Sequence, residues 1–495
     1  MAGFMIAAPR SGSGKTMVTC GILELLKRKQ KNPFSYKCGP DYIDGLFHRK
    51  VLGIEGGNLD SFFEQPQTMR EKYAAVSETH FPVVEGVMGY FDGLGGDTTA
   101  ASSWEVADIL NLPVVLVVDA KGASLSLAAL IKGFQVFQGE SQSSQANKNG
   151  NHIQAVILNR ISPMLYPRMK AVIEKETGVL VAGYVPELDF WQVGSRHLGL
   201  VLPGEIENLQ EQMRQLGDCL EKTLDVDVLL KLGEKADIDV LGSVTVTADG
   251  SSQKCEAQKN ADLVLQNQFA GEKISHSVIR IRLGVAWDEA FCFYYRDNLE
   301  FLEKQGVQIV QFSPVHDKHL PDDLDGLLLG GGYPELYAKA LEENETIRNE
   351  IRRKAEEDMP ILAECGGYLY LLKELEDENG TGYEMAGVFS GKGYKKGKNS
   401  HFGYITVQTE KDSLYLKAGE TIKGHEFHYW ESTQDENELK MQAKKPTGKR
   451  SWPCVTVKNQ VMAGFPHLYY PSLEGFGERF VQACDRYRMK RKRQQ

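Results

Sequence analysis

A short apolar run that leads into a glycine-containing loop and a lysine is the feature that most constrains this fold. The run covers residues 4–8, the loop follows it, and a helix-forming segment begins after the lysine. In such a strand–loop–helix unit, backbone N–H groups and a helix N-terminus surround phosphate oxygens. Pro9 stands where the strict phosphate-loop pattern has its first glycine. The predicted ATP-binding residues are Ser11, Gly12, Ser13, Gly14, Lys15 and Thr16, with Thr16 also expected to bind Mg²⁺.

Short apolar runs alternate with amphipathic stretches in both halves of the chain, which is typical of parallel sheets covered by helices. We therefore predict an α/β fold with two doubly wound domains. The expected strands are 4–8, 83–85, 114–118, 155–158 and 180–184 in the first half, and 279–286, 308–312, 326–329, 361–363 and 455–457 in the second.

A polar stretch divides the 495 residues into two large units. We predict a first domain over 1–232, a polar linker over 233–277, a second domain over 278–488 and a basic tail over 489–495. The Ser-, Gln- and Asn-rich segment 138–151 is expected to be a surface insertion.

The composition excludes several classes of protein. A net charge of −10 and a pI near 5.7 argue against a general nucleic-acid binder, and no apolar run is long enough to cross a membrane. The chain opens directly with a strand-like segment, so we expect no signal peptide and a cytoplasmic location. Eight scattered cysteines without paired spacing predict free thiols in a reducing compartment.

Cys365 follows an apolar run and precedes Gly366 and Gly367, an arrangement that resembles a nucleophile elbow. A sharp turn after a strand would lift the thiol out of the sheet and let backbone N–H groups converge on a developing oxyanion. The upstream run of glycines contributes Gly331 and Gly332 as further oxyanion residues together with Gly366. We predict an acyl-transfer nucleophile; the alternative is a buried packing cysteine.

Four acidic residues are candidates for metal or substrate binding. Glu85 ends an expected strand, and Asp92 follows it in a glycine-containing loop, where ligands bind at the edge of a parallel sheet. We predict that both acids bind Mg²⁺ or position a substrate near the γ-phosphate. Asp41 and Asp44 lie in a turn-forming segment and could instead be ordinary turn residues.

Several longer segments together resemble the cobyrinic acid a,c-diamide synthase family of cobalamin biosynthesis. They cover nearly the whole chain and read GPDYIDG, VEGVMGYFDG, VVLVVDAKG, VILNRIS, SRHLGLV, LLLGGGYPEL, AECGGYLYL and GHEFHYW. The resemblance implies an N-terminal synthetase domain similar to dethiobiotin synthetase and a C-terminal class I glutaminase domain. It further implies amidation of the a and c acetate groups of a corrinoid with ATP and glutamine. We expect small-molecule substrates, no nucleic-acid or membrane partner, and a homodimer as the assembly.

The resemblance also assigns roles to individual residues. It implies that Asp41, Tyr42 and Asp44 contact the substrate and that Asn159 lies near the adenine of ATP. His467 takes the position of the glutaminase base, whereas Tyr469 replaces the usual third glutamate. Weaker assignments are Ser195, Arg196 and His197.

Other interpretations stay open at this point. A diamide synthase for hydrogenobyrinic acid or nickel-sirohydrochlorin shares every motif, and cobyric acid synthase is a sister enzyme that fits GPDYIDG and GHEFHYW less well. The N-terminal half alone would also suit a partition-type ATPase switch. A zinc site at His425–His428 is disfavoured, because the spacing differs from HExxH and no third ligand is evident.

Overall fold

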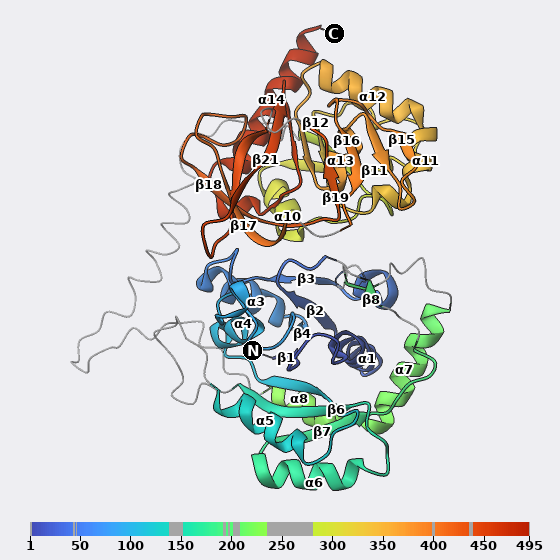
Figure 1. Cartoon of the computed structure of the whole chain (residues 1–495), viewed down its shortest axis with the longest axis vertical. Helices are drawn as coiled ribbons and strands as arrows, with labels where there is room; N and C mark the ends of the chain where they lie inside the picture. Colours follow the sequence, from blue (N-terminus) through green and yellow to red (C-terminus); the bar gives the residue numbers. More distant parts are fainter. Residues whose placement is uncertain are drawn as a thin grey trace, which may run out of the picture.

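The computed structural model describes residues 2–42, 45, 47–137, 152–191, 195–196, 199–200, 208–234, 281–397, 401–434 and 439–494. Two α/β bodies are visible in Figure 1, one coloured blue to green and one yellow to red. They meet where β3 Gly56–Leu59 of the first domain lies against α10 Arg296–Lys304 of the second. All seven cysteines that the structure describes are free thiols, as expected. No helix of the described part is both long and apolar enough to cross a bilayer.

The first domain contains a seven-stranded parallel sheet with the strand order β3-β2-β4-β1-β5-β6-β7. All five strands predicted in this half are present. The strands are β1 Phe4–Ala7, β2 Pro33–Cys38, β3 Gly56–Leu59, β4 Phe81–Glu85, β5 Val114–Asp119, β6 Ile153–Asn159 and β7 Leu180–Val185, beside a separate pair formed by β8 Ser195–Arg196 and β9 Gly199–Leu200.

Helices cover both faces of this sheet, which confirms the doubly wound fold. One apolar core lies beneath α1 Lys15–Arg28, α7 Leu209–Thr223 and α8 Val226–Glu234. The other lies beneath α3 Pro66–Ser77, α4 Ser103–Leu110, α5 Ser126–Val136 and α6 Tyr166–Thr177. Short turns of helix form η1 His48–Leu52 and η2 Leu94–Gly96. Of the predicted linker, 233–234 end α8 and 235–277 lie outside the described residues.

The second domain contains a ten-stranded mixed sheet. Its parallel half, in spatial order, is β11 Val307–Phe312, β10 Ile281–Ala286, β12 Gly326–Leu329, β13 Ile361–Glu364 and β22 Val461–Gly464. The antiparallel half continues with β21 Ser451–Lys458, β20 Leu439–Lys444, β17 Phe402–Gln408, β18 Thr421–Phe427 and β23 His467–Leu468. The predicted strand 455–457 thus belongs to the antiparallel half, because a tight turn at 459–460 joins β21 directly to β22.

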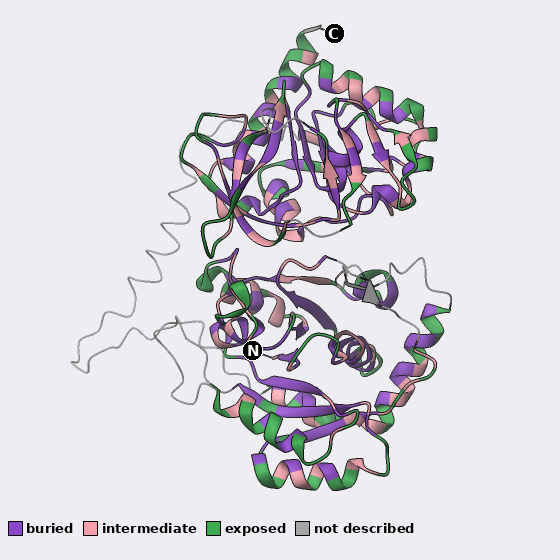
Figure 2. Ribbon diagram, in the orientation of Figure 1, coloured by how far each residue is buried: buried purple, intermediate pink, exposed green. Residues whose placement is uncertain are grey.

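A second, four-stranded sheet is formed by β15 Gly382–Glu384, β14 Glu374–Glu376, β16 Lys392–Lys395 and β19 Trp430–Ser432. Helices α10 Arg296–Lys304 and α14 Phe476–Gln494 pack on one face of the large sheet. The turn η6 Tyr470–Ser472 lies on this same face. The other face carries α11 Ala338–Glu343, α12 Glu345–Glu356 and α13 Gly366–Leu371, with the short turn η4 Pro334–Leu336 nearby. Figure 2 shows buried strands inside and exposed outer helix faces in both domains.

One apolar core crosses the boundary between the domains. Tyr42 and Phe63 of the first domain belong to the same buried cluster as Phe293, Tyr295 and Tyr469 of the second. Burial of five aromatic side chains across a boundary removes a large apolar area from water. The two domains therefore share one continuous apolar core at this point.

Candidate active site

The phosphate loop lies between β1 and α1, at the carboxyl edge of the parallel sheet. Gly14 has φ 94°, and a Cβ placed there would lie 2.2 Å from the Asn159 Nδ2 atom, so only glycine fits. Asn159 ends β6 and donates from Nδ2 to the Ser13 carbonyl over 2.8 Å. The structure thus shows Asn159 supporting the loop backbone, while its contact with adenine stays a prediction. Ser11 and Gly12 are exposed, as an incoming nucleotide requires.

Two side chains meet at the buried carboxylate of Glu85: Thr16, as predicted, and Lys37, for which sequence reasoning gave no role. The Thr16 hydroxyl donates to Glu85 Oε1 over 2.6 Å, and the Lys37 ammonium approaches the same oxygen at 2.8 Å. Lys15 donates to the Met88 carbonyl over 2.5 Å and so lies beside the loop that follows β4. A hydroxyl and a carboxylate are oxygen ligands of the kind that Mg²⁺ takes beside ATP phosphates. Thr16 and Glu85 therefore fit the predicted metal site.

Asp92 also lies beside the phosphate loop. Its Oδ2 atom accepts from the Gly89 N–H over 2.8 Å, and Gly89 approaches the Pro9 carbonyl so closely that a Cβ would lie 2.8 Å from it. Asp41 pairs with Lys37 at 3.7 Å. Asp44 and His197 lie outside the described residues, and of Ser195 and Arg196 only the backbone of β8 is described.

Cys365 occupies the sharp turn that the sequence predicts. It lies between β13 and α13 with φ 49° and ψ −102°, a conformation that is costly for a residue with a side chain. Its N–H donates to the Gly464 carbonyl over 2.8 Å, which ties the turn to β22. Because β22 leads directly into β23, this pairing brings His467 to the same edge of the sheet.

The predicted oxyanion glycines converge beside Cys365. A Cβ on Gly366 would lie 3.0 Å from the Gly332 nitrogen, and a Cβ on Gly331 would lie 2.4 Å from the His467 Cε1 atom. Larger residues at these positions would push the imidazole or the loop away. The structure therefore brings the three glycines together beside Cys365 and His467, and the Gly366 N–H donates to the thiol.

Burial keeps the thiol and the imidazole uncharged. Desolvation raises the pKa of Cys365 well above its ordinary value, and the carboxylate of Glu335 adds to the effect. Desolvation also lowers the pKa of His467 to about 3, with a smaller contribution from His428. A neutral imidazole is able to accept the proton of a neutral thiol. The two groups thus form a pair of neutral thiol and neutral imidazole.

Aromatic rings, and no carboxylate of the described residues, surround His467. Its ring stacks on His425 with centroids 4.8 Å apart, and Tyr42 of the first domain lies 5.4 Å away on a tilted plane. His425 is itself held by a 2.8 Å hydrogen bond between Nδ1 and the Tyr295 hydroxyl. The imidazole is oriented by packing, and Tyr42 places the first domain directly over it.

Tyr469, which replaces the usual glutamate, faces the other domain. Its ring stacks on Phe63 with centroids 4.9 Å apart, and its hydroxyl donates to Asp297 over 3.0 Å. Asp297 pairs with Lys72 of the first domain at 2.9 Å, and Lys72 pairs with Glu64 at 2.8 Å. Tyr469, at the position where a glutamate usually completes the catalytic triad, therefore takes part in the contact between the two domains.

Glu364 is a further residue at this site for which sequence reasoning gave no role. Its Oε1 atom accepts from the Leu468 N–H over 3.3 Å and from the Tyr470 hydroxyl over 3.2 Å. Burial raises the pKa of Glu364 to about 8. Since Glu364 precedes Cys365 and Leu468 follows His467, this carboxyl group holds the two chain segments in register. The sequence signal that could have pointed to Glu364 is its position in AECGG, between the strand and the elbow.

Comparisons with known proteins agree with this architecture. Residues 4–200 match the family described as a CobQ/CobB/MinD/ParA nucleotide binding domain, and residues 282–473 match the CobB/CobQ-like glutamine amidotransferase domain. The structure titled PurLQS from Thermotoga maritima is similar over 42% of this chain and 98% of its own, with a TM-score of 0.30 and 18% identity, too low to support an argument.

Curated relatives extend the match to nearly the full length. A cobyrinate a,c-diamide synthase of Caldanaerobacter subterraneus is 36% identical over 98% of both chains. Proteins of the same name from Streptococcus sanguinis and Salmonella typhimurium are each 37% identical, over 94% and 86% of this chain and 95% and 85% of their own. A nucleotide-binding domain joined to a glutamine amidotransferase domain defines a glutamine-dependent carbon–nitrogen ligase. The chain belongs to the cobyrinate a,c-diamide synthase family.

Proposed function

We propose that this enzyme uses ATP and glutamine to amidate the a and c acetate carboxylates of cobyrinic acid in cobalamin biosynthesis. The observation that carries the proposal is the 36% identity to a cobyrinate a,c-diamide synthase over 98% of both chains. The phosphate loop and the Cys365 elbow within one chain support it, because they supply the two half-reactions. The cytoplasm, where ATP and glutamine are available, is the proposed location, and the proposed assembly is a homodimer.

The first half-reaction activates a carboxylate. Hydroxide leaves a carboxylate poorly, so the γ-phosphoryl group moves from ATP to a substrate oxygen and gives an acyl phosphate and ADP. Ammonia then attacks the carbonyl carbon and phosphate leaves. Lys15 would contact the transferred phosphoryl group, and Thr16, Glu85 and Asp92 would hold Mg²⁺, which neutralises phosphate charge when bound. Asp41 and Asp44 would face the corrinoid.

The second half-reaction releases ammonia from glutamine. The Cys365 sulfur attacks the side-chain carbonyl carbon while His467 accepts the thiol proton. The N–H groups at Gly331, Gly332 and Gly366 would stabilise the oxyanion, and the proton passes to the leaving ammonia. Water then hydrolyses the thioester to glutamate. The buried position of the pair supports release of ammonia away from bulk water.

The test is an assay of the purified chain with ATP, glutamine and one tetrapyrrole at a time. Cobyrinic acid, hydrogenobyrinic acid and nickel-sirohydrochlorin are compared by ADP release and by chromatography of the mono- and diamide. We expect cobyrinic acid to give two ADP per diamide. Faster diamide formation from another tetrapyrrole would make that compound the substrate in place of cobyrinic acid. ADP release without any amide would refute the proposal that the enzyme is a ligase.

A further inference from the structure

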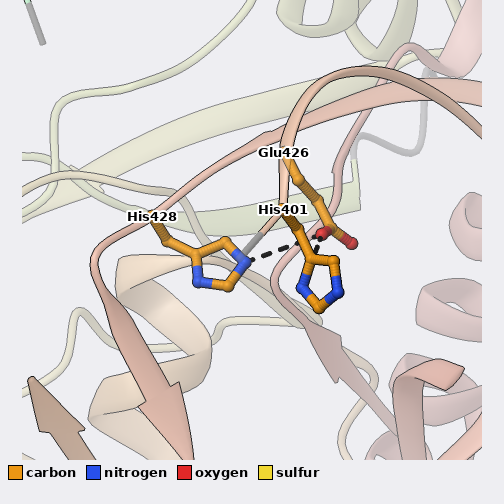
Figure 3. Close-up of side chains that lie close together, drawn as sticks. All are labelled: His401, Glu426 and His428. Atoms are coloured by element: carbon orange, nitrogen blue, oxygen red, sulfur yellow. Dashed lines mark ion pairs between the residues drawn. The ribbon is translucent and has the colours of Figure 1, made fainter. Parts of the chain in front are cut away.

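A second group of ionisable side chains lies on the opposite face of β18 from His425. His401 precedes β17, Glu426 lies in β18 and His428 follows it, and pairing of Phe402 with Phe427 brings these segments together. One ligand atom from each of the three residues lies within 4.8 Å of the other two (Figure 3). The third ligand that the sequence segment lacked therefore comes from the neighbouring strand.

The hydrogen bond of His428 reveals which of its nitrogens has a free lone pair. Its Nδ1 atom lies 2.6 Å from the Trp430 carbonyl, which can only accept, so Nδ1 carries a proton. The other nitrogen, Nε2, faces Glu426 Oε2 at 3.6 Å, too far for a hydrogen bond. Among the described residues, Nε2 has no hydrogen-bond partner.

Two buried electron-pair donors thus face each other. The side chains of His428 and Glu426 are 3% and 1% exposed. A neutral imidazole nitrogen beside a carboxylate oxygen is unfavourable in an apolar surrounding unless a cation lies between them. That cation is either a proton on Nε2 or a metal ion, and the third nitrogen ligand favours the metal.

Each of the three side chains is also held by a neighbour, as ligands of metal sites usually are. The Trp452 indole donates to both carboxylate oxygens of Glu426, over 3.1 and 3.3 Å, and stacks on His401 with centroids 4.3 Å apart. Phe465 stacks on His428 at 3.9 Å. The side chain of His401 is 20% exposed, which leaves a way in from solvent.

We propose that His401, Glu426 and His428 bind one divalent transition-metal ion of the zinc class. Two imidazoles and one carboxylate form a common three-residue ligand set for zinc, with a fourth position left to water, whereas Mg²⁺ and Ca²⁺ prefer oxygen ligands alone. The ion is distinct from the Mg²⁺ proposed beside ATP. It cross-links β17 to the end of β18 and supports Phe465, two residues before His467.

The experiment measures metal binding by the full chain. Protein stripped with a chelator is titrated with Zn²⁺ and, separately, with Co²⁺, whose visible absorption reports tetrahedral coordination. We expect one Zn²⁺ per chain by elemental analysis and a Co²⁺ spectrum that Zn²⁺ abolishes. His401→Ala should lose both signals. Trp452→Phe removes only the indole donor and should weaken Zn²⁺ binding about 10- to 100-fold.

His425→Gln is the matched control, since His425 lies one residue from Glu426 on the opposite face of β18. It should keep the metal content of the unaltered chain. Equal metal content in His401→Ala and the unaltered chain would overturn the proposal, as would the absence of stoichiometric Zn²⁺ and of a Co²⁺ spectrum. In that case a protonated His428 pairs with Glu426. If His401→Ala failed to fold, the Co²⁺ spectrum of the unaltered chain would still decide between these outcomes.

Discussion

The phosphate loop and the Cys365 elbow are built alike but differ in exposure. Both are turns that connect a buried strand to a helix at the carboxyl edge of a parallel sheet. A Cβ on Gly12 would meet nothing within 4 Å, whereas a Cβ on Gly331 would collide with the His467 ring. The tip of the phosphate loop is therefore open to solvent, and the thiol site is enclosed.

Cys365 is buried among residues of its own domain, whereas the His467 ring beside it is also covered by the other domain. Tyr42 lies among Phe293, Tyr295, His425 and His467, all of which belong to the second domain. Tyr42 also belongs to the GPDYIDG segment, next to Asp41, which is proposed to face the corrinoid. One short segment of the synthetase domain thus connects the open site to the enclosed one. We infer that the synthetase domain controls access to the thiol.

The largest expected effect is the loss of glutamine-dependent amidation when the nucleophile of the thiol site is removed. Cys365→Ala should lower glutamine-dependent amidation about 10³-fold or more, because no other group supplies the nucleophile. Amidation with added ammonium salt should remain. The control is Cys484→Ala, a buried cysteine in α14, which should keep both activities. Equal loss with both nitrogen donors would show that the sites are not separable.

Lys15→Ala tests the open site in the same assay. We expect amidation to fall about 100-fold or more with either glutamine or ammonia, since transfer of the phosphoryl group precedes attack by ammonia. Glutamine hydrolysis alone should persist. Arg10 lies nearby but is exposed, so Arg10→Ala serves as the charge-matched control. Unchanged amidation in Lys15→Ala would remove this lysine from the proposed site.

Substitutions of the two acids beside the phosphate loop, Glu85 and Asp92, should differ in their effect on stability. Glu85 is fully buried and paired with Lys37, so Glu85→Gln should lower ammonia-dependent turnover and also destabilise the fold by about 3 kcal/mol. Asp92 is exposed, and Asp92→Asn should lower turnover with little change in stability. Urea unfolding and ADP release measure the two effects. Turnover at the unaltered level in both variants would refute the proposed metal ligands.

The smallest effect concerns pH and the carboxyl group of Glu364. Burial raises its pKa to about 8, above its value of about 4.3 in an unfolded chain, so the folded state holds the proton more tightly. This contribution to stability is complete below about pH 4 and is lost as pH rises towards 8. Glu364→Gln should therefore unfold with a flatter pH dependence of Tm between pH 5 and 8. If Tm changed with pH in the same way in Glu364→Gln and in the unaltered chain, the result would contradict the raised pKa of Glu364.

The sequence allowed good prediction of features made by neighbouring residues. The strand–loop–helix unit at Lys15 and the elbow at Cys365 depend on local backbone geometry, which glycine positions and apolar runs reveal. The two doubly wound domains follow from the same alternation. The sequence did not indicate that residues 455–457 would pair antiparallel, because a short buried strand has a similar apolar sequence in parallel and antiparallel sheets.

Contacts between distant segments could not be predicted. Tyr42 meets His467, and Tyr469 meets Phe63, only because the two domains pack together. His401 joins Glu426 through the register of β17 and β18, which leaves no periodic signal in the sequence. The resemblance pointed to Tyr42 and Tyr469 as notable residues, but their surroundings required the structure.

The most direct test of the inferred control is the rate at which iodoacetamide alkylates Cys365, followed by mass spectrometry of the modified peptide. The burial of Cys365, the cover that Tyr42 gives to the neighbouring His467 ring, and the raised pKa of the thiol all predict slow labelling of the unaltered chain. Tyr42→Ala should label about 10-fold faster and hydrolyse glutamine without matching amide formation, whereas Tyr42→Phe, which keeps the ring, should label slowly. Equal labelling rates in all three proteins would contradict the conclusion that the synthetase domain controls access to the thiol.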